Sequence, residues 1–295
     1  MKTPSRVWLP FPKGERPGRT FLRPVETGFF AGLALLFTAC GNLEKEIVVP
    51  QPLFTPQLVV ECYLEPGEPY RLLLTESVNY LNADTSLVPV IGNATVRIGY
   101  GGQLETLYPG LVIDTTNRKA YNYTLNQKVV DDPNAEYTLE VTDPKGRRVT
   151  GTTRFPSLVP LKEITWGFNE KEKAYLTVRF DDPPDTEDYY RFVVTRDNLA
   201  GEVETNFTLE DRFGTNNEIT LGTGYEYEDG DTLLVSLFHI SKSYYDFLES
   251  ANDAASSNGN PFAQPALVKS TVRGGIGVFA ALVYDRKKIV VKKDG

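Results

Sequence analysis

The chain of 295 residues contains few of the side chains that most enzymes use for catalysis. It has one histidine, His239, two cysteines and a single methionine at position 1. A catalytic zinc ion takes about three His, Cys or carboxylate ligands, and a Ser/His/Asp triad needs a histidine beside its serine. The composition therefore leaves almost no side chains for a zinc, haem or serine-hydrolase site, and we expect no cofactor and no metal.

An excess of basic residues is also missing. The chain has 31 Lys and Arg against 39 Asp and Glu, for a formal net charge of −8, with 41% hydrophobic residues. Proteins that bind nucleic acids non-specifically need a basic face to displace counterions from phosphate. The acidic net charge therefore excludes a non-specific nucleic-acid-binding protein. The length, which is that of an ordinary globular protein, predicts two domains behind a targeting segment.

No apolar run is long enough to span a membrane. Residues 1–27 carry six Lys or Arg and two Glu, and residues 28–39 are uncharged and mostly apolar. A membrane-spanning helix needs about 20 apolar residues. A basic segment followed by this short apolar one is typical of a signal peptide, so residues 1–39 are predicted to be removed.

The residues at the end of this apolar run resemble a bacterial lipobox. The sequence Phe37-Thr38-Ala39-Cys40 places small residues before a cysteine, which in lipoproteins is acylated, with palmitate among its chains, and becomes the first mature residue. The alternative is that Cys40 simply lies in a buried apolar segment. Acylation predicts a membrane-anchored chain, with the proline-containing residues 40–56 as a tether. Cys62 then has no disulfide partner, and we expect it to be a buried thiol.

After the tether the sequence alternates apolar and polar residues with the period of β-strands. Short runs of this kind, separated by turn residues, predict an all-β chain with an immunoglobulin-like sandwich over residues 57–157 and a fibronectin-like sandwich over residues 158–295. Tyr137, which follows an acidic turn, resembles the tyrosine of the tyrosine corner in such sandwiches. Residues 241–251 predict one short helix in the second sandwich, with Ser241 as its cap.

These features together resemble a lipoprotein family of Bacteroidota-type Gram-negative bacteria, known as domain of unknown function number forty-two forty-nine. The resemblance rests on the first strand Leu58-Val59-Val60-Glu61, on Ile240-Ser241 before an aromatic-rich helix, and on Pro265 followed by the segment Gly274-Gly275-Ile276-Gly277-Val278-Phe279. It implies an outer-membrane lipoprotein that assists a TonB-dependent receptor in nutrient uptake. It implies no established enzyme activity.

Two kinds of motif have competing interpretations. Glycines 274, 275 and 277 could cradle a phosphate, but they precede a β-rich run rather than a helix, which favours a closely packed strand entry. Two acidic clusters could bind Ca²⁺ or supply the paired carboxylates of a hydrolase, although acidic turns of this kind are common in solvent. The clusters comprise Asp181, Asp182, Asp185, Glu187 and Asp188, and Glu226, Glu228, Asp229 and Asp231. His239 lies within a strand and is expected to be a half-exposed or satisfied histidine rather than a ligand or base.

We expect the protein to act by binding rather than by chemistry, with a membrane-anchored carboxylate hydrolase as the alternative. Large aromatic side chains at loops and on helices often form contact surfaces. The candidate interaction residues are Tyr244, Tyr245, Phe262, Gly274, Gly275 and Gly277. A simpler interpretation is that Tyr244 and Phe262 only cover the open face of the second sandwich. Further tyrosines that could face outward are Tyr121, Tyr123, Tyr189, Tyr225 and Tyr227.

Overall fold

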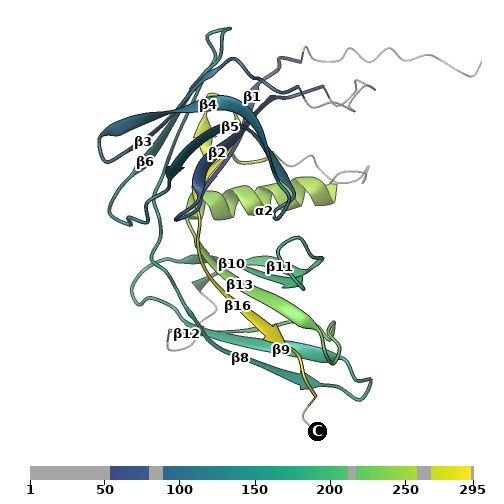
Figure 1. Cartoon of the computed structure of the whole chain (residues 1–295). Helices are drawn as coiled ribbons and strands as arrows, with labels where there is room; N and C mark the ends of the chain where they lie inside the picture. The colour runs from purple at the N-terminus through teal and green to yellow at the C-terminus, as the bar shows by residue number, and fades with distance from the viewer. Residues whose placement is uncertain (1–53, 80–88, 212–216, 258–266, 294–295) are drawn as a thin grey trace, which may run out of the picture. The chain divides into compact units, whose positions relative to one another are not determined.

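The computed structural model describes residues 54–79, 89–211, 217–257 and 267–293, which belong to one compact unit (Figure 1). These residues form β-strands and one helix, α2, so the predicted β-rich class with a single helix is confirmed at that level. Within the described ranges no helix is long and apolar enough to cross a bilayer.

The larger sheet has nine strands in the order β14-β7-β6-β3-β4-β5-β2-β1-β15. Its strands are β1 (Leu58–Leu64), β2 (Pro69–Glu76), β3 (Thr95–Tyr100), β4 (Gln103–Asp114), β5 (Lys119–Lys128), β6 (Tyr137–Thr142), β7 (Arg148–Thr153), β14 (Val272–Arg273) and β15 (Ile276–Ala281). The first part of β4 pairs with β3 and the second part pairs with β5, with a register shift after Pro109. The long strand therefore continues from one half of the sheet into the other, and both halves contribute to one hydrophobic cluster.

Strand β1 shows how the sequence pattern produces this core. Its buried residues alternate with half-buried ones, so Leu58, Val60, Cys62 and Leu64 all face the same cluster. The predicted buried thiol is confirmed, because Cys62 is fully buried and burial raises its pKa. The expectation for Tyr137 is confirmed as well: its hydroxyl donates a hydrogen bond of 2.7 Å to the carbonyl oxygen of Val130.

Two smaller sheets enclose a second cluster. The four-stranded sheet has the order β11-β10-β13-β16, and the three-stranded sheet has the order β12-β9-β8. Their strands are β8 (Leu161–Phe168), β9 (Ala174–Asp181), β10 (Tyr189–Arg196), β11 (Val203–Glu210), β12 (Glu218–Gly222), β13 (Thr232–Ile240) and β16 (Val283–Val290). Apolar side chains from both sheets, such as Phe180 and Phe192, meet in this cluster.

The course of the chain after α2 corrects the predicted boundary at residue 157. Residues 158–295 were assigned to the second sandwich, but β14 pairs with β7, and β15 pairs in parallel with β1. Residues Val59 to Leu64 of β1 pair with β15, and only afterwards does β16 join β13. The nine-stranded sheet therefore contains strands from both ends of the chain.

The helix α2 (Lys242–Ser257) begins one residue later and ends six residues later than predicted. The hydroxyl of Ser241 accepts a hydrogen bond from the backbone N–H of Tyr244, which confirms the predicted cap. The helix packs into a third cluster with Tyr189, Ile240 and residues of β15, so it lies beside strands of both regions (Figure 1).

Candidate functional site

Tyr244 does not belong to an exposed contact surface, which corrects the expectation from the sequence. Its side chain is buried, and its ring lies edge-on to that of Tyr63 with centroids 6.0 Å apart. Burial raises the pKa of Tyr244. The first turn of α2 faces β1 and β15, which explains why the apolar side of the helix is covered.

Tyr245 is half-buried. Its ring lies 4.8 Å from that of Tyr189, and its hydroxyl donates a hydrogen bond to Glu210. Of the other tyrosines that could face outward, Tyr225 is exposed, whereas those at 121, 123, 189 and 227 are buried. The aromatic content therefore serves mainly the hydrophobic clusters. Phe262 and Cys40 lie outside the described residues.

The three candidate glycines lie where the returning chain passes the first strands. A Cβ atom on Gly274 would stand 2.2 Å from the carbonyl oxygen of Arg148, and one on Gly275 would stand 2.7 Å from that of Leu58. Gly277 has a φ of +121°, and a Cβ atom there would stand 1.9 Å from the carbonyl oxygen of Val60. These glycines permit close backbone approach, which supports the strand-entry interpretation over a phosphate cradle.

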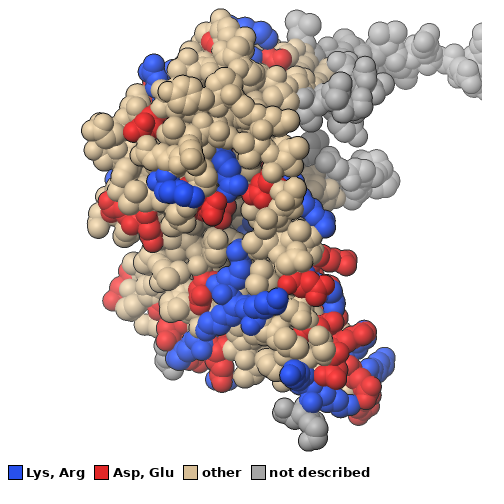
Figure 2. All heavy atoms as spheres, viewed as in Figure 1, with Lys and Arg blue, Asp and Glu red and all other residues tan. Residues whose placement is uncertain are grey.

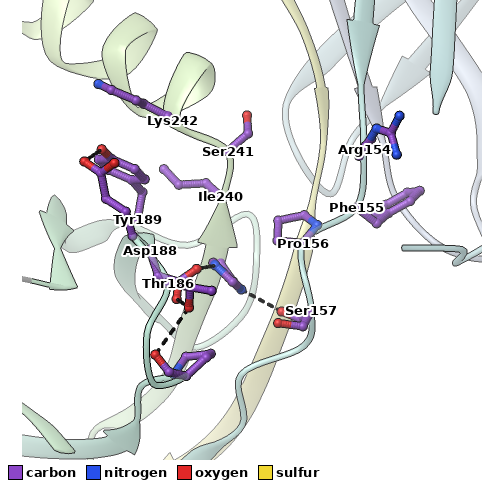
Figure 3. Close-up of a pocket in the computed structure, with 13 residues that line it drawn as sticks. Arg154, Phe155, Pro156, Ser157, Thr186, Asp188, Tyr189, Ile240, Ser241 and Lys242 are labelled. Atoms are coloured by element: carbon purple, nitrogen blue, oxygen red, sulfur yellow. Dashed lines mark hydrogen bonds and ion pairs between the residues drawn. The ribbon is translucent and has the colours of Figure 1, made fainter. Parts of the chain in front are cut away.

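One pocket contains the single histidine and lies where β7 leads into β8, beside the start of α2 (Figure 3). Its cavity has a volume of about 420 Å³. The lining residues are Arg154, Phe155, Pro156, Ser157, Pro183, Thr186, Glu187, Asp188, Tyr189, His239, Ile240, Ser241 and Lys242.

His239 joins two elements at the base of this pocket. Its Nδ1 lies 2.7 Å from the carbonyl oxygen of Ser157, and its Nε2 lies 2.9 Å from Oδ1 of Asp188. Both ring nitrogens therefore lie within hydrogen-bond distance of a protein oxygen. Both partners are oxygen acceptors, whereas a neutral imidazole carries one N–H.

The ring is also packed so that neither nitrogen is available to a ligand. His239 is 5% exposed and stacks on Tyr190, with centroids 5.0 Å apart. The hydroxyl of Tyr190 donates a hydrogen bond to Asp182, and burial raises the pKa of both groups. Since a general base needs a nitrogen within reach of its substrate, this histidine is a satisfied one, as expected.

The other ionisable groups of the pocket also have partners. Arg154 forms an ion pair with Glu136, and Lys242 forms one with Asp246. The hydroxyl of Tyr189 donates to Glu187, and this hydrogen bond, together with burial, raises the pKa of Tyr189 to about 12. The pocket therefore presents no unpaired carboxylate or base from these residues.

The acidic clusters form turns and ion pairs in the described residues. Asp231 pairs with Arg196 and accepts the backbone N–H of Glu228, and Glu228 pairs with Lys173. No group of three His, Cys, Asp or Glu side chains in the described part of the chain is arranged to hold a metal ion. The turn interpretation accounts for these contacts.

Sequence reasoning missed an apolar surface on the second part of β4. Tyr108, Leu111 and Ile113 are 64%, 74% and 66% exposed. The run from 106 to 113 contains no charged residue, and this is the only signal by which the sequence reveals it. Such a surface fits a contact with another macromolecule better than it fits catalysis.

Comparison with known proteins identifies a family. The model described as "Domain of unknown function (DUF4249)" matches residues 44–288. No curated protein is similar enough to this chain to count as a relative.

Several solved structures share low similarity with the chain. A cytokine receptor complex is 12% identical with a TM-score of 0.25, over 63% of this chain and 86% of that one. A segment of two fibronectin type III domains from chicken tenascin is 12% identical with a TM-score of 0.23, over 81% and 99% of the two chains. Domains FN1–FN3 of chicken CNTN1 are 10% identical with a TM-score of 0.26, over 79% and 66%. Sequence identities and TM-scores this low give no information about the function of this chain.

Proposed function

This chain belongs to the family described as Domain of unknown function (DUF4249), and we propose that it is an outer-membrane lipoprotein that acts by binding and not by catalysis. In this proposal the lipid on Cys40 holds the chain at the membrane, and the folded unit docks on a partner. The partner is a TonB-dependent receptor for nutrient uptake. The finer description of the fold as an immunoglobulin-like sandwich followed by a fibronectin-like one belongs to the same proposal.

The anchor is supported by the sequence before the folded unit. A basic segment, a short apolar run and a cysteine after small residues follow one another in the order of a lipoprotein signal. Two or more acyl chains anchor a protein firmly, whereas one chain binds reversibly. The proline-containing segment up to residue 56 supplies the length that separates the folded unit from the bilayer.

The observation that carries the non-catalytic role is the state of His239. It is the one histidine of the sequence, and Ser157 and Asp188 occupy both of its nitrogens. A hydrolase built from carboxylates would need two of them free across a groove, and Asp188, Glu187 and Asp231 each have a protein partner. Binding requires no such free groups.

Co-purification tests the proposal. A tagged chain, expressed from its own locus, is purified from detergent-solubilised outer membranes, and its partners are identified by mass spectrometry. We expect a TonB-dependent receptor in a fixed ratio to the chain. The matched control is Cys40→Ser, which should leave the outer-membrane fraction and lose the receptor.

Two results would overturn the proposal. One is a Cys40→Ser chain that remains in the outer membrane at the level of the unaltered chain. The other is a purified chain that carries no receptor and hydrolyses a glycoside or ester, with turnover abolished by one carboxylate substitution.

A further inference from the structure

A further cavity lies on the four-stranded sheet, between two tight turns. It has a volume of about 520 Å³, which is within the range of small-molecule sites. One wall is the turn between β4 and β5, which points toward this sheet in Figure 1, and the other is the turn between β10 and β11. Leu234 of β13 and Lys288 of β16, which are direct partners in the sheet, line the cavity between the two turns.

Both walls are held in place by hydrogen bonds. Oδ1 of Asp114 accepts two backbone N–H groups of the β4–β5 turn, and Oδ1 of Asn198 accepts one of the β10–β11 turn. The backbone N–H of Asp197 donates to the carbonyl oxygen of Thr232, which ties the second turn to β13. The cavity is therefore preformed, and a ligand that enters it does not have to order its walls.

Two opposite charges line the cavity without neutralising each other. Asp197 and Lys288 are exposed, and neither side chain forms an ion pair or a hydrogen bond with any residue in the described ranges. Elsewhere on the smaller sheets acidic and basic side chains are intermixed (Figure 2), and Lys162, for example, pairs with Asp181 and Glu218. Asp197 and Lys288 each keep a charge that is available to a ligand.

The sheet sets the spacing of these two charges. Asp197 lies beside Thr232 on one side of β13, and Lys288 lies beside Leu234 on the other side. With strands about 4.8 Å apart and a rise of about 3.4 Å per residue, the Cα atoms of Asp197 and Lys288 are about 12 Å apart. A single amino acid carries its ammonium and carboxylate groups on one carbon, whereas a peptide of about three residues spans about 10 Å. The spacing therefore fits a short peptide better than a free amino acid.

The other lining groups agree with this class of ligand. A simple anion would be repelled by Asp197, and a simple cation by Lys288. Leu199 and Leu234 are half-buried and offer an apolar surface to a side chain. The hydroxyls of the two threonines in the β4–β5 turn can donate to and accept from peptide groups.

We propose that this cavity binds a short peptide with free termini, whose ammonium group lies at Asp197 and whose carboxylate lies at Lys288. An apolar side chain of the peptide packs on Leu199 and Leu234. Ion pairs between exposed groups contribute little each, so the affinity is modest. The inference does not depend on the lipid anchor or on docking to a receptor.

An NMR titration of the fragment 54–295 with the tripeptide Ala-Leu-Ala tests this site. The fragment contains every described strand and all three hydrophobic clusters, so it retains the folded unit. We expect saturable shifts of the amide signals of residues 115–116 and 198–200. Acetylation of the peptide's N-terminus and amidation of its C-terminus should each weaken binding about threefold or more, because each removes one charge.

Variants of the cavity assign each terminus to its partner. Asp197→Asn should weaken binding of the free peptide as much as acetylation does, and acetylation should then have no further effect. Lys288→Met and amidation should behave in the same way. The matched controls lie outside the cavity and should leave binding unchanged: Asp185→Asn, at another exposed aspartate with a positive φ, and Lys171→Met, at another exposed lysine. Thermal melting of each variant checks that the fold is intact.

Three outcomes would overturn the inference. The first is the absence of saturable shifts with Ala-Leu-Ala. The second is binding that neither the blocked termini nor the two cavity variants weaken. The third is an equal loss of binding in the control variants, which would assign the effect to net charge and not to this cavity.

Discussion

The carbonyl oxygen of Val60 lies 1.9 Å from the point where a Cβ atom on Gly277 would stand. This approach accompanies the parallel pairing of β1 with β15, in which Val60 and Gly277 are direct partners. The first strand of the folded unit and a strand that follows α2 are thus joined in one sheet.

Gly277→Ala should destabilise the folded unit by about 3 kcal/mol or more, because the new methyl group collides with backbone and the φ of +121° suits glycine. Chemical denaturation monitored by circular dichroism measures the loss. Gly222→Ala is the control, since no atom lies within 4 Å of its Cβ position. Equal stability of the two variants would contradict the packing described here.

The fragment 54–157 should not fold stably alone. It keeps β1 to β7 but lacks β14 and β15, which cover the edges of β7 and β1. Phe279 and Val283 also leave the first cluster. We expect rapid amide exchange and a broad thermal transition for the fragment. A cooperative transition at the temperature of the fragment 54–295 would show that residues 57–157 form an independent domain after all.

His239→Gln should destabilise the protein by about 1–3 kcal/mol, because it weakens the hydrogen bonding of the buried Asp188 carboxyl group. The control is the double variant with Asp188→Asn, in which both members of the pair are replaced. A double-mutant cycle on unfolding free energies should show strong coupling between the two positions. Additive losses would mean that the ring and the carboxylate act separately.

Stability should fall in acid through the ion pairs of Arg147. The hydrogen bond from Arg147 lowers the pKa of Glu76. Burial alone would raise the pKa of Asp143, but hydrogen bonds from Arg147 outweigh it and hold that pKa below its ordinary value. Carboxyls with lowered pKa values stabilise the folded state above their unfolded pKa, and this stabilisation is lost as pH falls through the folded pKa.

Denaturation of the wild type and of Arg147→Gln between about pH 6 and about pH 3 measures this effect. The variant should lose less stability over that range, because its carboxyls titrate nearer their ordinary values. Arg154→Gln, which removes an exposed ion pair with Glu136, should follow the wild type. If the unfolding free energies of Arg147→Gln and the wild type fell in parallel with pH, the stabilising role of Arg147 toward Glu76 and Asp143 would be contradicted.

The strands with strict alternation could be predicted from the sequence, and those without it could not. β1 alternates buried and half-buried residues along its whole length, which is the period that marks a strand in the sequence. β11 and β12, which the sequence analysis did not identify, are edge strands that contain many half-buried or exposed residues. Each of them pairs with a strand that is distant or only partly specified in the sequence, and the alternation of apolar and polar residues does not reveal such pairing.

The candidate site, too, could be predicted from the sequence only where local pattern determines it. The bonded state of His239 was foreseen from its place within a strand, but its partners Ser157 and Asp188 come from distant segments. Tyr244 was expected on the surface because the return of β15 across the helix has no local signal. The glycines were interpreted correctly as a strand entry, since their spacing and the β-rich run after them are local features.

Site-specific photo-crosslinking in intact cells tests the central claim most directly. A photo-reactive amino acid replaces, one at a time, the exposed residues Leu111, Leu158, Val203, Tyr225 and Leu267. The account predicts that a subset of positions on one surface forms a covalent product with a TonB-dependent receptor, while the others do not. Anchored, fully expressed chains that form no receptor product at any of these positions would contradict it.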